Sequence, residues 1–202
     1  MEKETDKLFL SLTVLFAASG IAGLIYQIAW QRVLFAAFGS DIESVSLIVA
    51  TFMLGLGLGA LAGGWLADRL PGKEFLIFAL CETGIGLYGL FSVNLLRFVG
   101  EAFVQSPRAA MALVNFLLVL PPTAFMGGTL PILIAGVARR LGHVGRATGH
   151  LYSVNTFGAA MGALLTAWIL FDLVDLTTAV RMAAILNLVV AGLVLYRLKG
   201  LR

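Results

Sequence analysis

The chain has 202 residues, of which 60% are hydrophobic and only 12% are charged. A soluble domain carries about twice that share of charged residues, so the composition excludes an ordinary soluble protein. The formal net charge of +3 does not indicate a nucleic-acid partner, because the basic residues are spread over short joints between apolar stretches.

Six apolar stretches follow one another along the chain. Each has at least about 18 residues, the length that crosses the hydrocarbon core of a membrane as a helix. They predict an all-α membrane protein, a single six-helix transmembrane domain over residues 1–202. The predicted spans are residues 8–38, 45–67, 75–96, 109–138, 147–171 and 179–196.

The distribution of Lys and Arg predicts the orientation. With six spans both termini share one side of the membrane, and cytoplasmic joints are enriched in cations. We therefore expect both termini in the cytoplasm and the protein in the cell (inner) membrane. The terminal side has ten cations (Lys3, Lys7, Arg69, Lys73, Arg139, Arg140, Arg146, Arg197, Lys199, Arg202) and the other side three (Arg97, Arg108, Arg181).

The first span carries aromatic and polar side chains towards its far end. Tyr26 and Trp30 are four residues apart and share a helix face, and Gln27 with Gln31 form a second pair one position round. An aromatic pair beside amides can hold a small polar or cationic ligand. The alternative for Trp30 and Arg32 is anchoring at the outer membrane boundary.

Glycines recur at four-residue spacing in the second and fifth spans. Such stripes let helix backbones approach closely in lipid. Two interpretations stay open: packing inside one copy of the chain, or a contact between two copies. The glycines are Gly55, Gly59 and Gly63 in the second span, and Gly158 and Gly162 in the fifth.

The joint after the second span, residues 64–73, reads GWLADRLPGK. Asp68 ends a helix here and can hold Arg69 or a neighbouring helix end through charge-assisted hydrogen bonds. Such a clasp can favour one conformation and release in another. The alternative is a plain helix stop with cytoplasmic cations.

The third span contains Glu82, the only carboxylate far from a joint. Polar groups at membrane depth are costly and mark candidate functional sites. An ionised Glu82 needs a cation or several hydrogen-bond donors, and otherwise it stays protonated. It is predicted to be a proton-coupling or cation-binding residue; the alternative is a structural hydrogen bond to a neighbouring helix.

The fourth and fifth spans add further candidates. Pro121, Pro122 and Pro131 predict a kink in the fourth span, which membrane helices tolerate where neighbours satisfy the freed carbonyls. Tyr152 and Asn155 lie one turn apart in the fifth span and form a second-tier site candidate, with interhelical hydrogen bonding as the alternative. The sequence predicts no metal site and no cofactor.

Two resemblances to known proteins follow from these motifs. The joint with Asp68, Arg69 and Lys73 resembles the signature between helices two and three of the major facilitator superfamily, G-x-L-A-D-R-x-G-[RK]-[RK]. It departs from that signature by the extra Pro71 and by Glu74, where a second cation is often found.

The second resemblance covers nearly the whole chain. Residues 19–32, 52–59, 82–88, 126–131 and 149–158 look like the membrane domain of fused facilitator/spermidine-synthase-like proteins. Those proteins often have Glu where this chain has Gln27, and they often continue into an aminopropyltransferase-like domain, whereas this chain stops at Arg202. It has no nucleotide-binding glycine loop before an acidic strand end, so we do not expect it to be an enzyme.

The resemblance implies a function. Facilitators have two six-helix halves related by an axis along the membrane normal, and this chain looks like one half, which a parallel homodimer would complete. We expect a transporter that moves a small polar or cationic solute, for example a polyamine, by alternating access, at a site on the axis between the two copies that the first and fourth spans line.

Two other functions stay open. One is a membrane anchor or scaffold for a soluble aminopropyltransferase-like partner, and the other is transport of a lipid or hydrophobe. The basic joint with Arg139, Arg140 and Arg146 is also expected to contact anionic membrane lipid.

Overall fold

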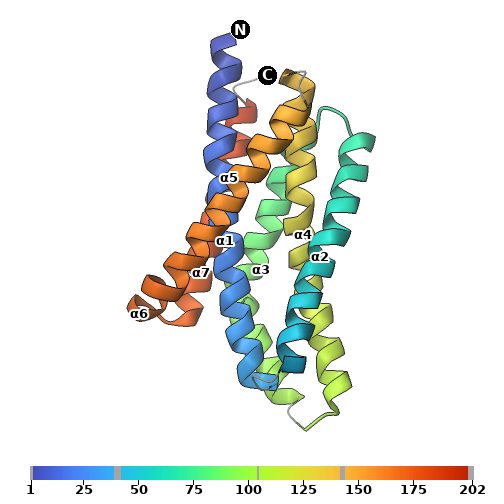
Figure 1. Cartoon of the computed structure of the whole chain (residues 1–202), viewed down its shortest axis with the longest axis vertical. Coiled ribbons are helices and arrows are strands. Elements are labelled where there is room, and N and C mark those ends of the chain that lie inside the picture. Colours follow the sequence, from blue (N-terminus) through green and yellow to red (C-terminus); the bar gives the residue numbers. More distant parts are fainter. Residues whose placement is uncertain (1, 39–41, 104, 142–143, 200–202) are drawn as a thin grey trace.

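The protein is built from helices. The computed structural model describes residues 2–38, 42–103, 105–141 and 144–199, and no strand occurs within these ranges (Figure 1). Six helices of this described part are long and apolar enough to cross a membrane, which confirms the predicted fold. The elements are α1 (Glu2–Phe38), α2 (Ile42–Arg69), α3 (Glu74–Ala102), α4 (Arg108–Leu141), α5 (Val144–Leu165), the π-helical turn η1 (Thr166–Leu170), α6 (Phe171–Leu173) and α7 (Leu176–Lys199).

The helices extend beyond the predicted spans at most ends. Helix α3 has 29 residues, which is about 43 Å at 1.5 Å per residue, whereas the hydrocarbon core is about 30 Å thick. Charged residues such as Arg97 and Glu101 set the predicted end of this span, yet the helix continues through them because a helix need not stop at the edge of the hydrocarbon.

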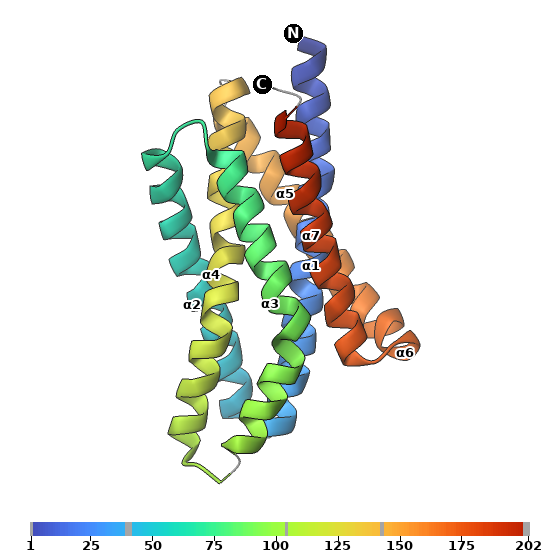
Figure 2. The same cartoon turned by 180° about the vertical axis from the view of Figure 1, so that it is seen from behind.

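The bundle consists of three helix pairs. The most extensive contacts join α2 to α4, α1 to α5, and α3 to α7. Helices α2 and α5 face the viewer in Figure 1, and α3 and α7 lie side by side on the opposite face, seen in Figure 2. Because α3 also packs against α4, and α7 against α1, the α3–α7 pair joins the other two pairs.

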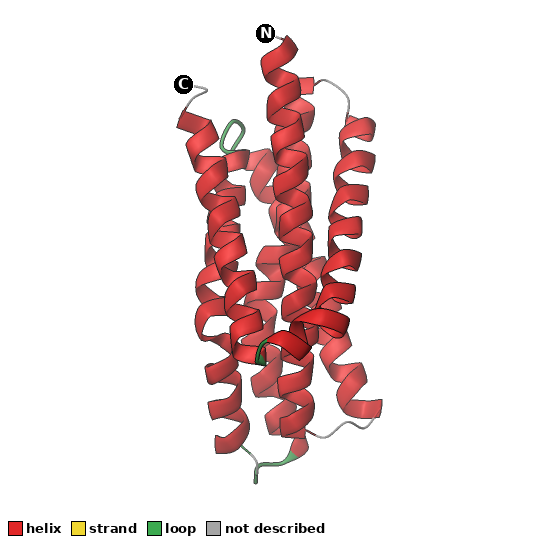
Figure 3. Cartoon of the chain, turned by 90° about the vertical axis from the view of Figure 1, so that its left-hand side faces the viewer, coloured by secondary structure: helices red, strands yellow, loops and turns green. Residues whose placement is uncertain are grey.

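The helices run along the long axis of the bundle, with one exception (Figure 3). The regular α-helix of the fifth span ends at Leu165, where the chain widens into the π-helical turn η1 and continues into the short α6, which lies out to the side of the bundle. The hydroxyl of Thr166 donates to the Gly162 carbonyl oxygen at 2.6 Å at the start of this turn. The turn into α7 is therefore displaced from the end of the bundle.

The glycines of α2 pack against α4 of the same chain. A Cβ atom added at Gly59 would lie 1.9 Å from the carbonyl oxygen of Ala124, far inside ordinary contact distance. The two backbones therefore touch with no side chain between them. An added Cβ would lie 1.8 Å from the Thr123 hydroxyl oxygen at Gly55, and 2.6 Å from the Gly128 carbonyl oxygen at Gly63.

The glycines of α5 pack in the same way against α1. An added Cβ would lie 2.2 Å from the Ala17 carbonyl oxygen at Gly158, and 2.4 Å from that of Ile21 at Gly162. The prediction that the five glycines form a contact between two copies is therefore wrong. Their surfaces are already covered within one copy, which is the other interpretation that the sequence left open.

Helix α4 continues through its three prolines as one helix. Pro122 has no N–H, so the carbonyl of Leu118, one turn earlier, loses its helical partner. The hydroxyl of Tyr88 on α3 donates to this carbonyl oxygen at 2.9 Å. A neighbouring helix thus satisfies the freed group, as bilayer helices with proline require.

Candidate functional site

A layer of polar side chains divides the buried core of the bundle. One apolar cluster contains Tyr26 and Ile85, and a second contains Phe16 and Phe78. The polar side chains of this layer, Ser19, Glu82 and Asn187, lie between the two clusters in α1, α3 and α7, and all are at most 9% exposed. Burying three polar groups at one depth is costly in lipid and indicates a site.

Glu82 is the centre of the layer. It is 0% exposed. The Ser19 hydroxyl donates to its Oε1 at 2.6 Å, and the Asn187 amide Nδ2 donates to its Oε2 at 2.5 Å. No Lys, Arg or His of the described residues forms an ion pair with it, so each carboxylate oxygen has a single neutral donor.

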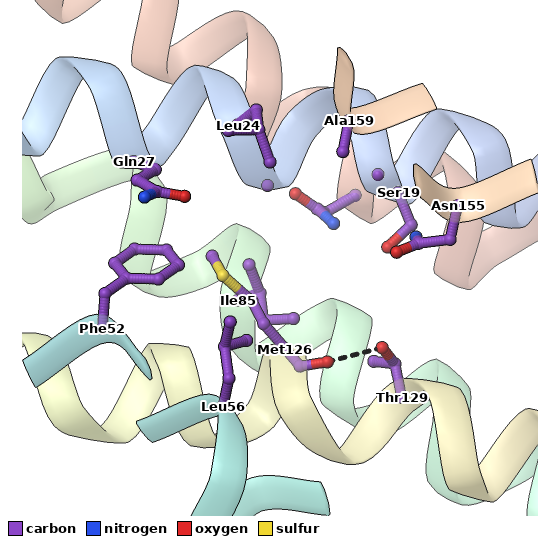
Figure 4. Close-up of a pocket in the computed structure, with 13 residues that line it drawn as sticks. Ser19, Leu24, Gln27, Phe52, Leu56, Ile85, Met126, Thr129, Asn155 and Ala159 are labelled. Atoms are coloured by element: carbon purple, nitrogen blue, oxygen red, sulfur yellow. Dashed lines mark hydrogen bonds between the residues drawn. The ribbon is translucent and has the colours of Figure 1, made fainter. Parts of the chain in front are cut away.

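A partly open pocket lies in front of this layer. Its volume is about 130 Å³, which is room for several water molecules or for the head group of a small solute. Figure 4 shows its walls: α1 and α5 on one side, α2 and α4 on the other. The polar residues of the lining are Ser19, Gln27, Thr129, Asn155 and Asn187, and apolar ones such as Phe52, Leu56 and Met126 complete it.

Ser19 and Asn187 belong both to the pocket lining and to the shell of Glu82. The carboxylate therefore lies one side chain behind the pocket wall. The Oδ1 atom of Asn187 is buried and has no hydrogen-bond partner among the described residues. An unpaired buried acceptor next to a carboxylate is unusual, and it indicates that a hydrogen-bond donor other than the described residues binds at this place.

Two further predicted site residues line the same pocket. Gln27 is half-buried in the α1 wall. Asn155 of α5 donates from Nδ2 to the carbonyl oxygen of Phe16 at 3.1 Å, and in Figure 4 it lies beside Ser19. The structure thus brings Gln27, Glu82 and Asn155 around one pocket.

Tyr26 and Trp30 do not line this pocket. Their rings stack with centroids 5.0 Å apart, so the predicted shared face is confirmed. That face packs against α3, however, where the Trp30 Nε1 donates to the Ser92 hydroxyl at 2.9 Å. The predicted ligand-holding role is wrong because the two residues are at most 1% exposed. Anchoring of Trp30 at the membrane boundary is excluded for the same reason.

Arg32 and Tyr152 also lie outside the pocket. The Arg32 guanidinium sits 4.7 Å from the ring centroid of Phe171, at the end of the fifth span. Tyr152 is 59% exposed on the outer surface of α5. Neither is brought to Glu82 within one copy, and their predicted place in a substrate site between two copies stays a prediction.

The joint between α2 and α3 carries an ion-pair clasp, and its centre is Arg139 of α4. This guanidinium pairs with the buried carboxylate of Glu74, and its Nη2 donates to the Ala67 carbonyl oxygen at 3.0 Å. Asp68 lies 3.9 Å from the same Nη2 but is largely exposed. Asp68 is therefore near a neighbouring helix end, one of the two partners that the sequence left open, although Glu74 is the closer partner of Arg139.

The other two residues predicted for the clasp take no part in these ion pairs. Arg69 lies over the ring of Trp65, 4.3 Å from its centroid. Lys73 precedes α3 and makes no side-chain capping bond. The backbone N–H of Gly72, which has φ +85°, donates to Glu74 at 2.9 Å. Glu74, a departure from the facilitator signature, thus orders the joint itself.

Comparison with known proteins identifies the family. The model of the Major Facilitator Superfamily matches residues 8–200. The chain belongs to this superfamily of membrane transporters. With its six apolar helices, this makes the protein a multi-pass membrane protein. No solved structure matches the chain.

The curated relatives of this facilitator chain are named polyamine aminopropyltransferase. The chain is 27% identical to the one of Mycobacterium tuberculosis, over 88% of this chain and 34% of the relative. It is 30% identical to the one of Corynebacterium efficiens, over 92% of this chain and 36% of the relative. The chain thus spans about a third of these relatives, in agreement with the resemblance to the membrane part of fused proteins.

The sequence did not reveal three residues of this facilitator site as candidates. They are Ser19, Thr129 and Asn187, which line the pocket together with Gln27 and Asn155, in front of Glu82. Ser19 and Thr129 are common in membrane helices, and Asn187 stands alone in its span. A usable signal was depth, because Asn187 lies at the middle of its predicted span, 179–196, and Glu82 lies well inside its own, 75–96.

Proposed function

We propose that this chain is a half-size facilitator that moves a small polar or cationic solute by alternating access, as a parallel homodimer. The observation that carries the proposal is the pocket of about 130 Å³ with the Glu82 layer behind it. A chain that served only as an anchor would gain nothing from a buried carboxylate, whose desolvation costs several kcal/mol.

The arrangement of contacts supports a moving pocket. Helix α1 packs extensively on α5, and α2 on α4, but the contacts of α1 with α2 and α4 are sparse. The pocket lies along this weakly packed seam. Pairs of helices that hold together internally and touch little across a seam can slide as units, so the seam is where we propose that the pocket opens to one side and then the other.

The charge of the site supports a cationic solute. The lining contains no Lys, Arg or His, and the carboxylate of Glu82 lies directly behind its residues Ser19 and Asn187. A concave site with one sign of charge concentrates ions of the opposite sign. The relatives are named for polyamine chemistry, which suggests an amine, such as a polyamine, as the solute for this chain as well.

The proposed homodimer uses the outward faces of α2 and α5, because the inward glycines are already covered. Gly57 has no other residue within 4 Å of an added Cβ, and Ala60 on the same face is exposed. On α5, Gly149, Ser153 and Ala160 form a second exposed stripe of small residues. Close backbone approach between these stripes would join two copies.

Flux into liposomes tests the proposal. Purified protein is reconstituted, and uptake of radiolabelled putrescine is measured against protein-free liposomes. Excess unlabelled butanediol and succinate, which match putrescine in length but are neutral and anionic, are added as competitors. We expect uptake that neither competitor reduces. Absence of protein-dependent uptake would contradict transport, and inhibition by succinate would contradict a cationic solute.

One observation favours a second function. The chain matches only about a third of relatives that are named as enzymes. This favours a membrane anchor or scaffold for an aminopropyltransferase-like partner. We propose that the protein lies in the inner membrane with both termini in the cytoplasm, which would place this partner at the cytoplasmic face. The flux assay separates the two, because an anchor carries no solute.

A further inference from the structure

The negative charge of Glu82 has no positive partner among the residues that the structure describes. The side chains of α1 and α7 that donate hydrogen bonds to it belong to the neutral residues Ser19 and Asn187. Two other titratable groups interact with its charge, the Tyr26 hydroxyl on α1 and the Cys81 thiol on α3, and both are ordinarily neutral near neutral pH. A carboxylate so placed needs a proton or a cation from outside.

The walls contributed by α4 and α5 do not supply that cation either. Their polar residues at the pocket are Thr129 and Asn155, both uncharged. Among the described residues, the pocket is therefore the place from which a compensating charge can approach Glu82, past Ser19 and Asn187, which lie between the two. A charged group in the pocket is separated from this carboxylate by a single side chain, so the two charges interact electrostatically.

The amide of Asn187 can serve either state of Glu82. It donates from Nδ2 to the carboxylate in this structure. Asn187 as a whole is 2% exposed, and its Oδ1 has no hydrogen-bond partner among the described residues. If Glu82 is protonated, the acid O–H becomes a donor, and an amide turned over would accept it. If Glu82 is ionised, Oδ1 remains free to accept an N–H from the pocket.

The free acceptors of the pocket suit an ammonium group. The Thr129 hydroxyl gives its proton to the Met126 carbonyl oxygen at 2.7 Å, which leaves its lone pairs free. Together with Asn187 Oδ1 and the Ser19 oxygen it offers acceptors to a group with three N–H donors and one positive charge. The described residues contain no cluster of His, Cys, Asp and Glu for a metal ion.

We propose that an ammonium group of the solute binds at Asn187 Oδ1 and the Ser19 hydroxyl, and that Glu82 exchanges its proton for this charge. When the ammonium enters, the Glu82 carboxyl gives its proton to water in the pocket, and the solute supplies the compensating charge. No bond of the solute breaks, and one proton leaves for each charge bound. This inference rests on the proposed function and makes the chain a proton–amine exchanger.

Proton release on binding tests the exchange. The full chain in nanodiscs is titrated with propylammonium in weak buffer, with a pH-indicator dye and calorimetry read in parallel. We expect about one proton per ammonium bound at acidic pH, and an apparent Kd that rises about tenfold for each pH unit lowered below the midpoint, since the two cations compete. Propanol, the neutral counterpart, should release none.

Variants on one helix provide the controls. Glu82→Gln should abolish proton release and the pH dependence of the Kd, whereas Glu101→Gln, an exposed carboxylate near the end of α3, should leave both unchanged. Should Glu82→Gln fail to fold, Ser19→Ala is expected to weaken binding about tenfold and keep proton release.

Other outcomes overturn the inference. Equal affinity for propylammonium at about pH 6 and about pH 8 without proton release would refute exchange. Equal proton release by KCl at the same concentration would make this a site for alkali cations instead. If liposomes still carry putrescine in these cases, the proposed transport stands and the exchange fails; if nothing binds and nothing is carried, both fail.

Discussion

The contact between α2 and α4 gives the sharpest test of the packing, through the substitution Gly59→Ala. The added Cβ would lie 1.9 Å from the Ala124 carbonyl oxygen, and ordinary contact begins at 3.4 Å. The obstacle is backbone, which cannot rotate away, so α2 and α4 must separate by about 1.5 Å or their ridges must shift. Overpacking of this kind costs about 1–3 kcal/mol.

Gly64→Ala is the matched control, five residues away on the same helix and outside the proposed contact between copies. Its Cβ would meet only the Pro131 Cβ, at 4.0 Å, so it keeps only the gain in helix propensity, which is at most about 1 kcal/mol. Unfolding of both variants is followed by circular dichroism during SDS titration of detergent micelles. We expect Gly59→Ala to be less stable than the natural chain by about 1–3 kcal/mol, and Gly64→Ala to be equal or more stable.

The result that refutes this reasoning is equal stability of the two variants. A second unfavourable outcome is a Gly59→Ala variant that folds normally but no longer associates with a second copy. That outcome would show that Gly59 lies in an interface between copies, and it would contradict the contact of Gly59 with Ala124 inside one chain.

Three further predictions concern single polar contacts. Tyr88→Phe leaves the Leu118 carbonyl without its donor, and SDS unfolding should show a loss of about 1–3 kcal/mol. Glu74→Gln removes the buried partner of Arg139; because that guanidinium is half-exposed, we expect a loss of about 1–2 kcal/mol in the same assay. The hydrogen bond from the Thr178 hydroxyl lowers the pKa of Asp175, which caps α7, below its usual 3.8. Its stabilisation is therefore present above pH 3.8 and is lost as the pH falls below that value, and Asp175→Asn should remove this part of the pH dependence of the thermal melting temperature.

The sequence predicted the six spans because the length of an apolar stretch is itself the constraint that a membrane imposes. For Asp68 it left Arg69 and a neighbouring helix end open as partners, and the structure places the carboxylate near Arg139 of α4. Hydropathy did not predict how each helix is rotated about its axis. A membrane helix is apolar on nearly every side, so the polar face that orients a soluble helix is missing.

The error at Tyr26 and the omission of Asn187 have this common cause. Tyr26 and Gln27 are neighbours in sequence, yet one faces α3 and the other the pocket. The hydrogen bonds of Glu82 join residues 63 and 105 positions apart. No local pattern encodes which two of several polar residues meet across such separations, although Glu82 itself was recognisable as a carboxylate at membrane depth.

Labelling of a single cysteine in the pocket tests the central claim most directly. Cys81 is the one cysteine of the chain, so Gln27→Cys in a Cys81→Ser background places one thiol in the α1 wall. A membrane-impermeant thiol reagent is applied to right-side-out and to inside-out vesicles. The account predicts labelling from both sides, and protection by putrescine on either side. Labelling from one side only, or from neither, would contradict a pocket that opens alternately across the membrane.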